Sequence, residues 1–290
     1  MAVAHGSRDP RAAATVSELL SVVRSRAGAR HGLAGLAVRS AFLDHCAPSL
    51  PQVLGSLDAE PRAVVVPLLL TAAYHSKTDI PAQLAAARAA AGAGSAAPDV
   101  RCTDTLGPHP LLLAALERRL REACVGVDSA ADRAVTSVVL AAAGSSDPAA
   151  NATIADLAAT WRRDRGWRAV VPAYASATVP SPAEAVRALL GDGAATVVVA
   201  TYLLAPGYFA DKIRASAVAA GASAVSQALG AAPEVADVIL ARYAAGRRLN
   251  RLWPEPSYTE RTVATPQLVT YSIRGHRRGT ELTARAPRRE

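Results

Sequence analysis

The chain has 290 residues, of which 51% are apolar, so it is long enough to bury a sizeable core in one large or two modest domains. Its formal net charge is +8, but the stretch from Gly246 onward holds ten arginines against four glutamates. The rest of the chain is therefore nearly neutral, which argues against a nucleic-acid-binding fold. The three cysteines form no C-x-x-C pair, and the longest apolar run, residues 63–73, is too short to cross a bilayer. These features predict a reduced, cytoplasmic protein with no membrane partner.

The first half of the chain alternates apolar runs with amphipathic segments, a pattern typical of a parallel α/β lobe. The opening run ends at His5, and Asp9 and Pro10 then mark a helix start, as N-cap and first helical residue. The continuous apolar run at residues 63–70 indicates a central strand buried on both faces. Further strands are expected at residues 36–43 and 99–103, and helices at residues 11–27, from 48, from 81 to about 91, and 110–124.

The pattern then restarts, with strands expected at residues 135–143, 169–174 and 196–203. The sequence G-S-S-D-P at residues 144–148 repeats G-S-R-D-P at residues 6–10. Further anchors follow in the same order, which predicts an internal duplication of about 125 residues. The predicted organisation is a lobe at residues 1–127, a second lobe at 128–245, and a basic, irregular tail at 246–290.

Three strand ends in the first lobe carry side chains suited to chemistry: His5, Asp44 and His75. Ligands of open α/β sheets bind at the carboxyl ends of strands, so we expect these residues to share one site. Two imidazoles and a carboxylate suit a divalent first-row metal such as Fe²⁺ or Co²⁺, and equally suit proton transfer near neutral pH. The residues alone leave both interpretations open.

The duplication is unequal in these side chains. Ala143 stands where His5 stood, Ser176 stands where Asp44 stood, and Tyr208 lies near the place of His75. The second lobe therefore keeps the turns without the titratable groups. This predicts one active site, furnished by the first lobe and enclosed by the second.

Several anchors together resemble the sirohydrochlorin chelatase family, the small cobalt and iron chelatases of cobalamin and siroheme synthesis. They are V-A-H-G-S-R at residues 3–8, F-L-D at 42–44, P-L-L-L-T-A-A-Y-H at 67–75, D-I-P at 79–81 and L-G-P-H-P at 106–110. The resemblance covers about residues 1–243 and includes the duplicated layout of the long family form.

The resemblance implies insertion of Fe²⁺ or Co²⁺ into sirohydrochlorin without ATP, in a cleft between two flavodoxin-like lobes. It implies that His5 and His75 are the paired catalytic histidines and hold the metal. The family's acidic residue, often Glu, corresponds to Asp44, which would orient a histidine or relay a proton. No tightly bound cofactor is implied, and monomer or homodimer both fit.

Sirohydrochlorin carries many carboxylates, which cationic and amide groups near the opening turn would bind. The residues expected to contact substrate are Ser7, Arg8, Lys77, His109 and Tyr208. His45 follows Asp44 directly, so strand alternation predicts that it points to the other face.

Two alternative functions fit the same segments. One is a non-catalytic carrier of metal or tetrapyrrole. The other is a phosphate- or nucleotide-binding protein that uses the turn at Gly6 and Ser7, although the fuller fingerprints G-x-G-x-x-G and G-x-x-x-x-G-K-[ST] are missing.

Overall fold

The computed structural model describes residues 1–57, 62–72, 78–90, 99–124 and 127–248. His75 and Lys77 lie outside the described residues, so their predicted roles stay predictions. Within the described part, the chain forms two four-stranded sheets in which every pairing is parallel.

The two sheets have the same strand order, which repeats in the second half of the chain. The first is ordered β2-β1-β3-β4 and the second β6-β5-β7-β8. Their strands are β1 (Ala2–Ala4), β2 (Ser40–Phe42), β3 (Arg62–Pro67) and β4 (Asp99–Cys102), then β5 (Thr136–Ala142), β6 (Ala169–Tyr174), β7 (Thr196–Tyr202) and β8 (Ala224–Val225). This repeated order confirms the predicted pair of α/β lobes.

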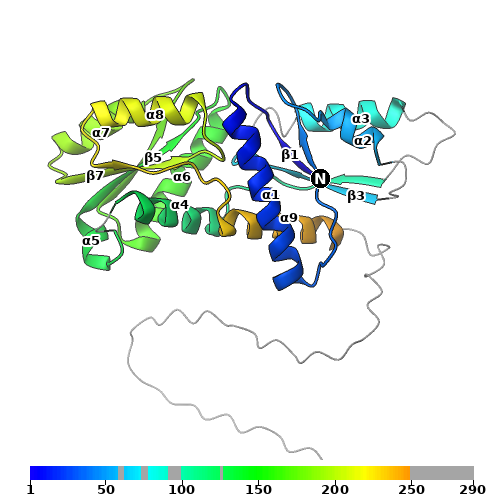
Figure 1. The fold of residues 1–290 in the computed structure, drawn as a ribbon. Helices are drawn as coiled ribbons and strands as arrows, with labels where there is room; N and C mark the ends of the chain where they lie inside the picture. Colours follow the sequence, from blue (N-terminus) through cyan, green and yellow to red (C-terminus); the bar gives the residue numbers. More distant parts are fainter. Residues whose placement is uncertain (58–61, 73–77, 91–98, 125–126, 249–290) are drawn as a thin grey trace, which may run out of the picture. The chain divides into compact units, whose positions relative to one another are not determined.

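Each sheet has an outer layer of two helices (Figure 1). The helices α2 (Leu50–Gly55) and α3 (Ile80–Ala90) share a buried cluster with β1 and β3. In the second lobe, α7 (Pro182–Gly191) and α8 (Tyr208–Ala219) share the equivalent cluster with β5 and β7. The valines on these strands alternate between this outer cluster and the inner core, as parallel strands buried on both faces do.

The inner helix layer is exchanged between the lobes. The helix α4 (Pro110–Ala123) follows β4 in the chain but packs on β7 and β8 of the second sheet. The helix α9 (Pro233–Arg248) follows β8 but packs on β3 and on α1 (Pro10–His31) of the first lobe. The helix at residues 110–124, which was expected to complete the first lobe, therefore covers the sheet of the second.

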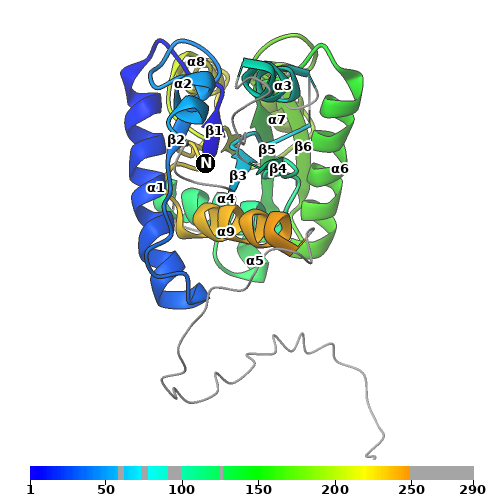
Figure 2. The ribbon, with the colours of Figure 1, turned by 90° about the vertical axis from the view of Figure 1, so that its right-hand side faces the viewer.

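The exchange makes one continuous core from both lobes. The largest buried cluster takes residues from both sheets, from α1, α4 and α9, and from α6 (Pro148–Arg165). The helices α4 and α9 contact each other on the side of the sheets opposite α2, α3, α7 and α8 (Figure 2), and Arg118 of α4 pairs with Glu234 of α9 at 2.6 Å. The two lobes therefore share their interior although their sheets are separate.

The end of α9 differs from the predicted boundary at residue 245. The helix continues to Arg248, and Gly246 is buried against β3 and the loop after β4. A Cβ at Gly246 would lie 2.9 Å from Val64 and 2.8 Å from Thr103. The segment from Gly246 to Arg248 thus belongs to the helix and not to the tail.

The helix starts follow the sequence signals. Asp9 accepts a hydrogen bond from the Arg11 amide at 2.9 Å, and Asp147 accepts one from the Ala149 amide at the same distance. The short α5 (Ala130–Val135), which was not expected, begins at a capping box on Ser129. No helix in the described part of the chain is long and apolar enough to cross a membrane.

Candidate active site

A cavity of about 600 Å³ lies between the lobes, at the carboxyl ends of four strands. Its walls come from the residues that follow β1 and β3 in the first lobe and β5 and β7 in the second. These segments are residues 5–8, 68–71, 142–145 and 202–210. The fold thus places a ligand-sized space where parallel sheets commonly bind ligands.

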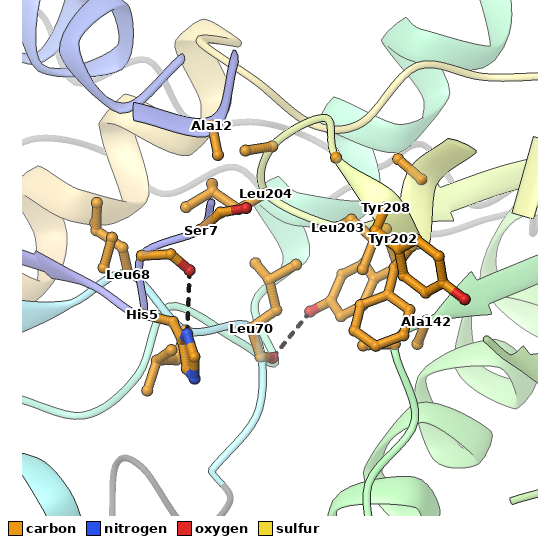
Figure 3. A pocket seen from close by; sticks show the side chains of 18 of the residues that line it. His5, Ser7, Ala12, Leu68, Leu70, Ala142, Tyr202, Leu203, Leu204 and Tyr208 are labelled. Carbon is orange, nitrogen blue, oxygen red and sulfur yellow. Dashed lines mark hydrogen bonds between the residues drawn. The ribbon is translucent and has the colours of Figure 1, made fainter. Parts of the chain in front are cut away.

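His5 lies on the first-lobe wall of this cavity (Figure 3). Its ring Nδ1 lies 3.1 Å from the carbonyl oxygen of Gly6, and its own carbonyl accepts a hydrogen bond from the Asp44 amide at 2.9 Å. Gly6 has a φ of 96°, and a Cβ there would lie only 1.8 Å from the Asp44 carbonyl oxygen. Only glycine fits this close contact, which holds the two strand ends together behind His5.

The structure places Asp44 and His45 differently from the sequence expectation. His45 lines the cavity, whereas the Asp44 side chain is 61% exposed and is not among the described lining residues. The alternation rule fails because β2 ends at Phe42 and His45 adopts a left-handed turn with a φ of 61°. Asp44 remains close to a histidine, but that histidine is His45, whose Nε2 lies 3.2 Å from Asp44 Oδ2.

Ser7 and Arg8 line the cavity beside His5. The Ser7 hydroxyl accepts a hydrogen bond from the Asp9 amide at 3.1 Å, and the Ser7 amide donates to Cys46 Sγ at 3.5 Å. Two of the amides expected to bind substrate carboxylates, those of Ser7 and Asp9, are therefore already hydrogen-bonded within the protein. Among the described lining residues, Arg8 carries the only permanent positive charge, and no carboxylate lines the cavity.

The wall from the second lobe is mostly apolar, with Ser145 and Asn151 among its polar side chains. Ala143 occupies the position of His5, and Tyr208 and Phe209 lie at the start of α8, where they are 72% and 39% exposed. The two rings contact each other edge to face, with centroids 5.5 Å apart. An exposed aromatic pair beside a cavity suits a flat, apolar ligand surface.

A buried tyrosine connects the two walls. The Tyr202 hydroxyl donates a hydrogen bond to the Leu70 carbonyl at 3.2 Å (Figure 3). Burial raises the pKa of Tyr202, so its hydroxyl stays protonated. A Cβ at Gly107 would lie 2.3 Å from the Leu70 oxygen and 2.5 Å from the Tyr202 hydroxyl, so the backbone of the first lobe can approach this pair only at a glycine. No sequence motif indicates this role of Tyr202, because the role depends on contacts between distant segments.

His109 is not among the described lining residues and serves as the N-cap of α4. Its Nδ1 accepts a hydrogen bond from the Leu111 amide at 3.1 Å. Burial, with the nearby Arg242, lowers the pKa of His109, which keeps the ring neutral and able to accept this bond. Within the described residues no group of three or more His, Cys, Asp or Glu side chains is arranged to hold a metal. Because His75 lies outside those residues, its pairing with His5 stays a prediction.

The chain is similar to known proteins over most of its length. The family model CbiX matches residues 1–123 and again residues 137–245, one match for each lobe. The chain belongs to the CbiX family. The two matches also support the internal duplication that the repeated turns predicted.

Among curated proteins, the chain is similar to the sirohydrochlorin cobaltochelatase of Priestia megaterium, with 28% identity over 209 residues. The match covers 71% of this chain and 63% of that protein, so the chain spans less than two thirds of its relative's length.

Solved structures of similar fold include SirB from Bacillus subtilis with Fe³⁺, with a TM-score of 0.69 at 22% identity. SirB from Bacillus subtilis subspecies spizizenii in complex with cobalt gives a TM-score of 0.65, also at 22% identity. Each match covers 84% of this chain and 93% of the other. At this identity the similarity establishes the fold, a duplicated chelatase-like pair of lobes.

Proposed function

We propose that this CbiX-family protein is a sirohydrochlorin chelatase, which inserts Fe²⁺ or Co²⁺ into sirohydrochlorin without ATP. The observation that carries the proposal is the cavity between the lobes, whose two walls differ in chemistry. The first-lobe wall offers His5, His45 and Arg8, and the second offers alanines, leucines and an exposed aromatic pair. The curated relative named as a cobaltochelatase supports the same reaction.

A tetrapyrrole fits such a cavity for simple chemical reasons. One face of the flat macrocycle would lie on the apolar second wall, where Tyr208 contacts it. The opposite face of the macrocycle would then face the imidazoles of the first wall. Arg8 and Ser7, with Lys77 from outside the described residues, would bind carboxylates at the rim.

The proposed reaction exchanges two pyrrole protons for one divalent metal ion. His5, together with His75, would hold the incoming metal, because neutral imidazole is a good ligand for Fe²⁺ and Co²⁺. The metal is a substrate of this reaction and not a resident cofactor. Both metals suit imidazole, so the proposal includes both.

The test is a turnover assay with purified full-length protein, sirohydrochlorin and either metal under anaerobic conditions, followed by absorbance. We expect a rate well above the spontaneous one, and we expect His5→Ala to lower kcat by about 100-fold or more. His5 is half-buried at a strand end, so the variant should keep the melting temperature of the parent. A rate equal to the spontaneous one would refute the enzyme, and tight macrocycle binding without turnover would support a carrier instead.

A further inference from the structure

We propose that His45 accepts the pyrrole protons from the bound macrocycle as the metal enters, and that Asp44 positions His45 for this role. The inference rests on the proposed chelatase function and assigns metal binding and proton acceptance to different histidines. His5 serves the metal, whereas His45 serves the protons.

The composition of the cavity walls limits which groups can take a proton. The described part of the second-lobe wall has no His, Asp, Glu, Lys or Cys. Its buried tyrosine, Tyr202, already donates its hydroxyl proton to Leu70. Among the described lining residues, His5 and His45 carry the only imidazoles, so the first wall must supply both the metal ligand and the proton acceptor.

The geometry of His45 suits the second task. Asp44 accepts a hydrogen bond from the His45 amide at 2.8 Å, and its other carboxylate oxygen faces the ring Nε2 at 3.2 Å. A carboxylate beside Nε2 favours the tautomer in which Nε2 carries the proton and Nδ1 carries the lone pair. Within the described residues, Nδ1 of His45 has no hydrogen-bond partner. The ring is therefore oriented by one nitrogen and available through the other.

The second lobe shows that this turn does not need histidine in order to fold. Ala177 occupies the equivalent position with a φ of 64°, close to the 61° of His45. Ser176 replaces Asp44 there and donates its hydroxyl to the Ala143 carbonyl instead. The same backbone thus carries an imidazole and a carboxylate only on the wall that holds His5, which is what a chemical role predicts.

The proton transfer is balanced without any further reactant. The N–H electron pair stays on the pyrrole nitrogen, which becomes a metal ligand, and the proton passes to Nδ1 of His45. The Asp44 carboxylate stabilises the resulting imidazolium. Because the side chains of His45 and Asp44 are 32% and 61% exposed, the proton can leave to solvent before the second one is transferred. Each metal ion inserted releases two protons.

The deciding experiment compares full-length His45→Ala and His45→Gln with the parent in the chelatase assay. We expect kcat to fall by about 100-fold in both, the size typical of losing a general base, while KM for sirohydrochlorin changes by less than about twofold. Added imidazole should restore turnover in His45→Ala, where space is opened, and not in His45→Gln, where glutamine fills it. Asp44→Asn should lower kcat by about tenfold with the same KM, as the loss of an orienting partner does.

The outcomes separate the two proposals. If the parent protein is no faster than the spontaneous reaction, the proposed function fails. If the parent is active and His45→Ala keeps its full rate, or loses rate through KM alone without rescue by imidazole, the role of His45 is overturned. Melting temperatures equal to the parent's, which the alanine at position 177 leads us to expect, exclude misfolding as the cause.

Discussion

The two lobes have the same strand-end turns but carry different chemistry on them. Gly6 and Gly144 both have positive φ values, of 96° and 85°. A Cβ on either would lie about as close to a neighbouring carbonyl oxygen, at 1.8 Å from Asp44 and 2.0 Å from Ser176. The duplicated part is thus the backbone contact between two strand ends, which places the next residue at the cavity wall.

The lobes differ in the side chains that the turn carries and in the side chains that hydrogen-bond to its backbone. In the first lobe the Ser7 amide and carbonyl both bond to Cys46 Sγ, whereas in the second the Ser145 amide and carbonyl both bond to the Asn151 side chain. Different side chains from different elements therefore maintain the same turn. The backbone turn is present in both lobes, whereas the described imidazoles of the cavity wall come from the first lobe.

The largest expected effect comes from separating the lobes at the predicted boundary, residue 127. A fragment of residues 1–127 would keep the first sheet without α9, which covers it, and would expose the face of α4 that packs on the second sheet. We expect this fragment to lack cooperative thermal unfolding when followed by circular dichroism. Mixing it with residues 128–253 should restore a single transition, because α4 can then pack on the second sheet and α9 on the first.

The control for that experiment is a chain that ends at Trp253, which keeps both sheets and both exchanged helices. It should unfold in one transition at a temperature near that of the full chain. Cooperative unfolding of the isolated fragment would show that the exchange of α4 and α9 contributes little to the stability of each lobe.

The sequence predicted those features that are encoded by neighbouring residues. Apolar runs indicated the central strands, the Asp9-Pro10 pair indicated the start of α1, and the repeated turns indicated the duplication. His5 and Arg8 were expected at one site and both line the cavity. Each of these follows from local pattern or from the rule that parallel strands end at a common edge.

The features that the sequence did not predict depend on contacts between distant segments. Amphipathic periodicity shows that α4 buries one face, but it does not say against which sheet. The placement of His45 was misjudged because alternation applies only within a strand, and β2 ends before that residue. Pro48, three residues after His45, cannot donate to a strand ladder and is the sequence signal that the strand ends before it.

A smaller effect compares the equivalent serines of the two turns. The hydroxyls of Ser7 and Ser145 accept hydrogen bonds from the amides of Asp9 and Asp147, at 3.1 Å and 3.0 Å. Ser7→Ala and Ser145→Ala should therefore each cost about 1 kcal/mol in the free energy of unfolding, measured by urea denaturation. If Ser7 also binds a substrate carboxylate, Ser7→Ala alone should raise KM for sirohydrochlorin several-fold. A KM equal to the parent's in Ser7→Ala would remove Ser7 from the substrate site.

The smallest expected effect concerns the ion pair that joins the exchanged helices. Burial of Glu234 acts to raise its pKa, but hydrogen bonds from Arg118 and the charges of Arg118 and Arg26 outweigh burial and leave the pKa lowered. A carboxyl whose pKa is lowered by folding stabilises the protein above its unfolded pKa and loses this contribution as the pH falls through the folded value. Glu234→Gln should therefore lower the melting temperature at pH 7 by a few degrees, and the difference from the parent should shrink below about pH 4. A difference that stays constant with pH would show that the carboxylate charge does not hold α4 against α9.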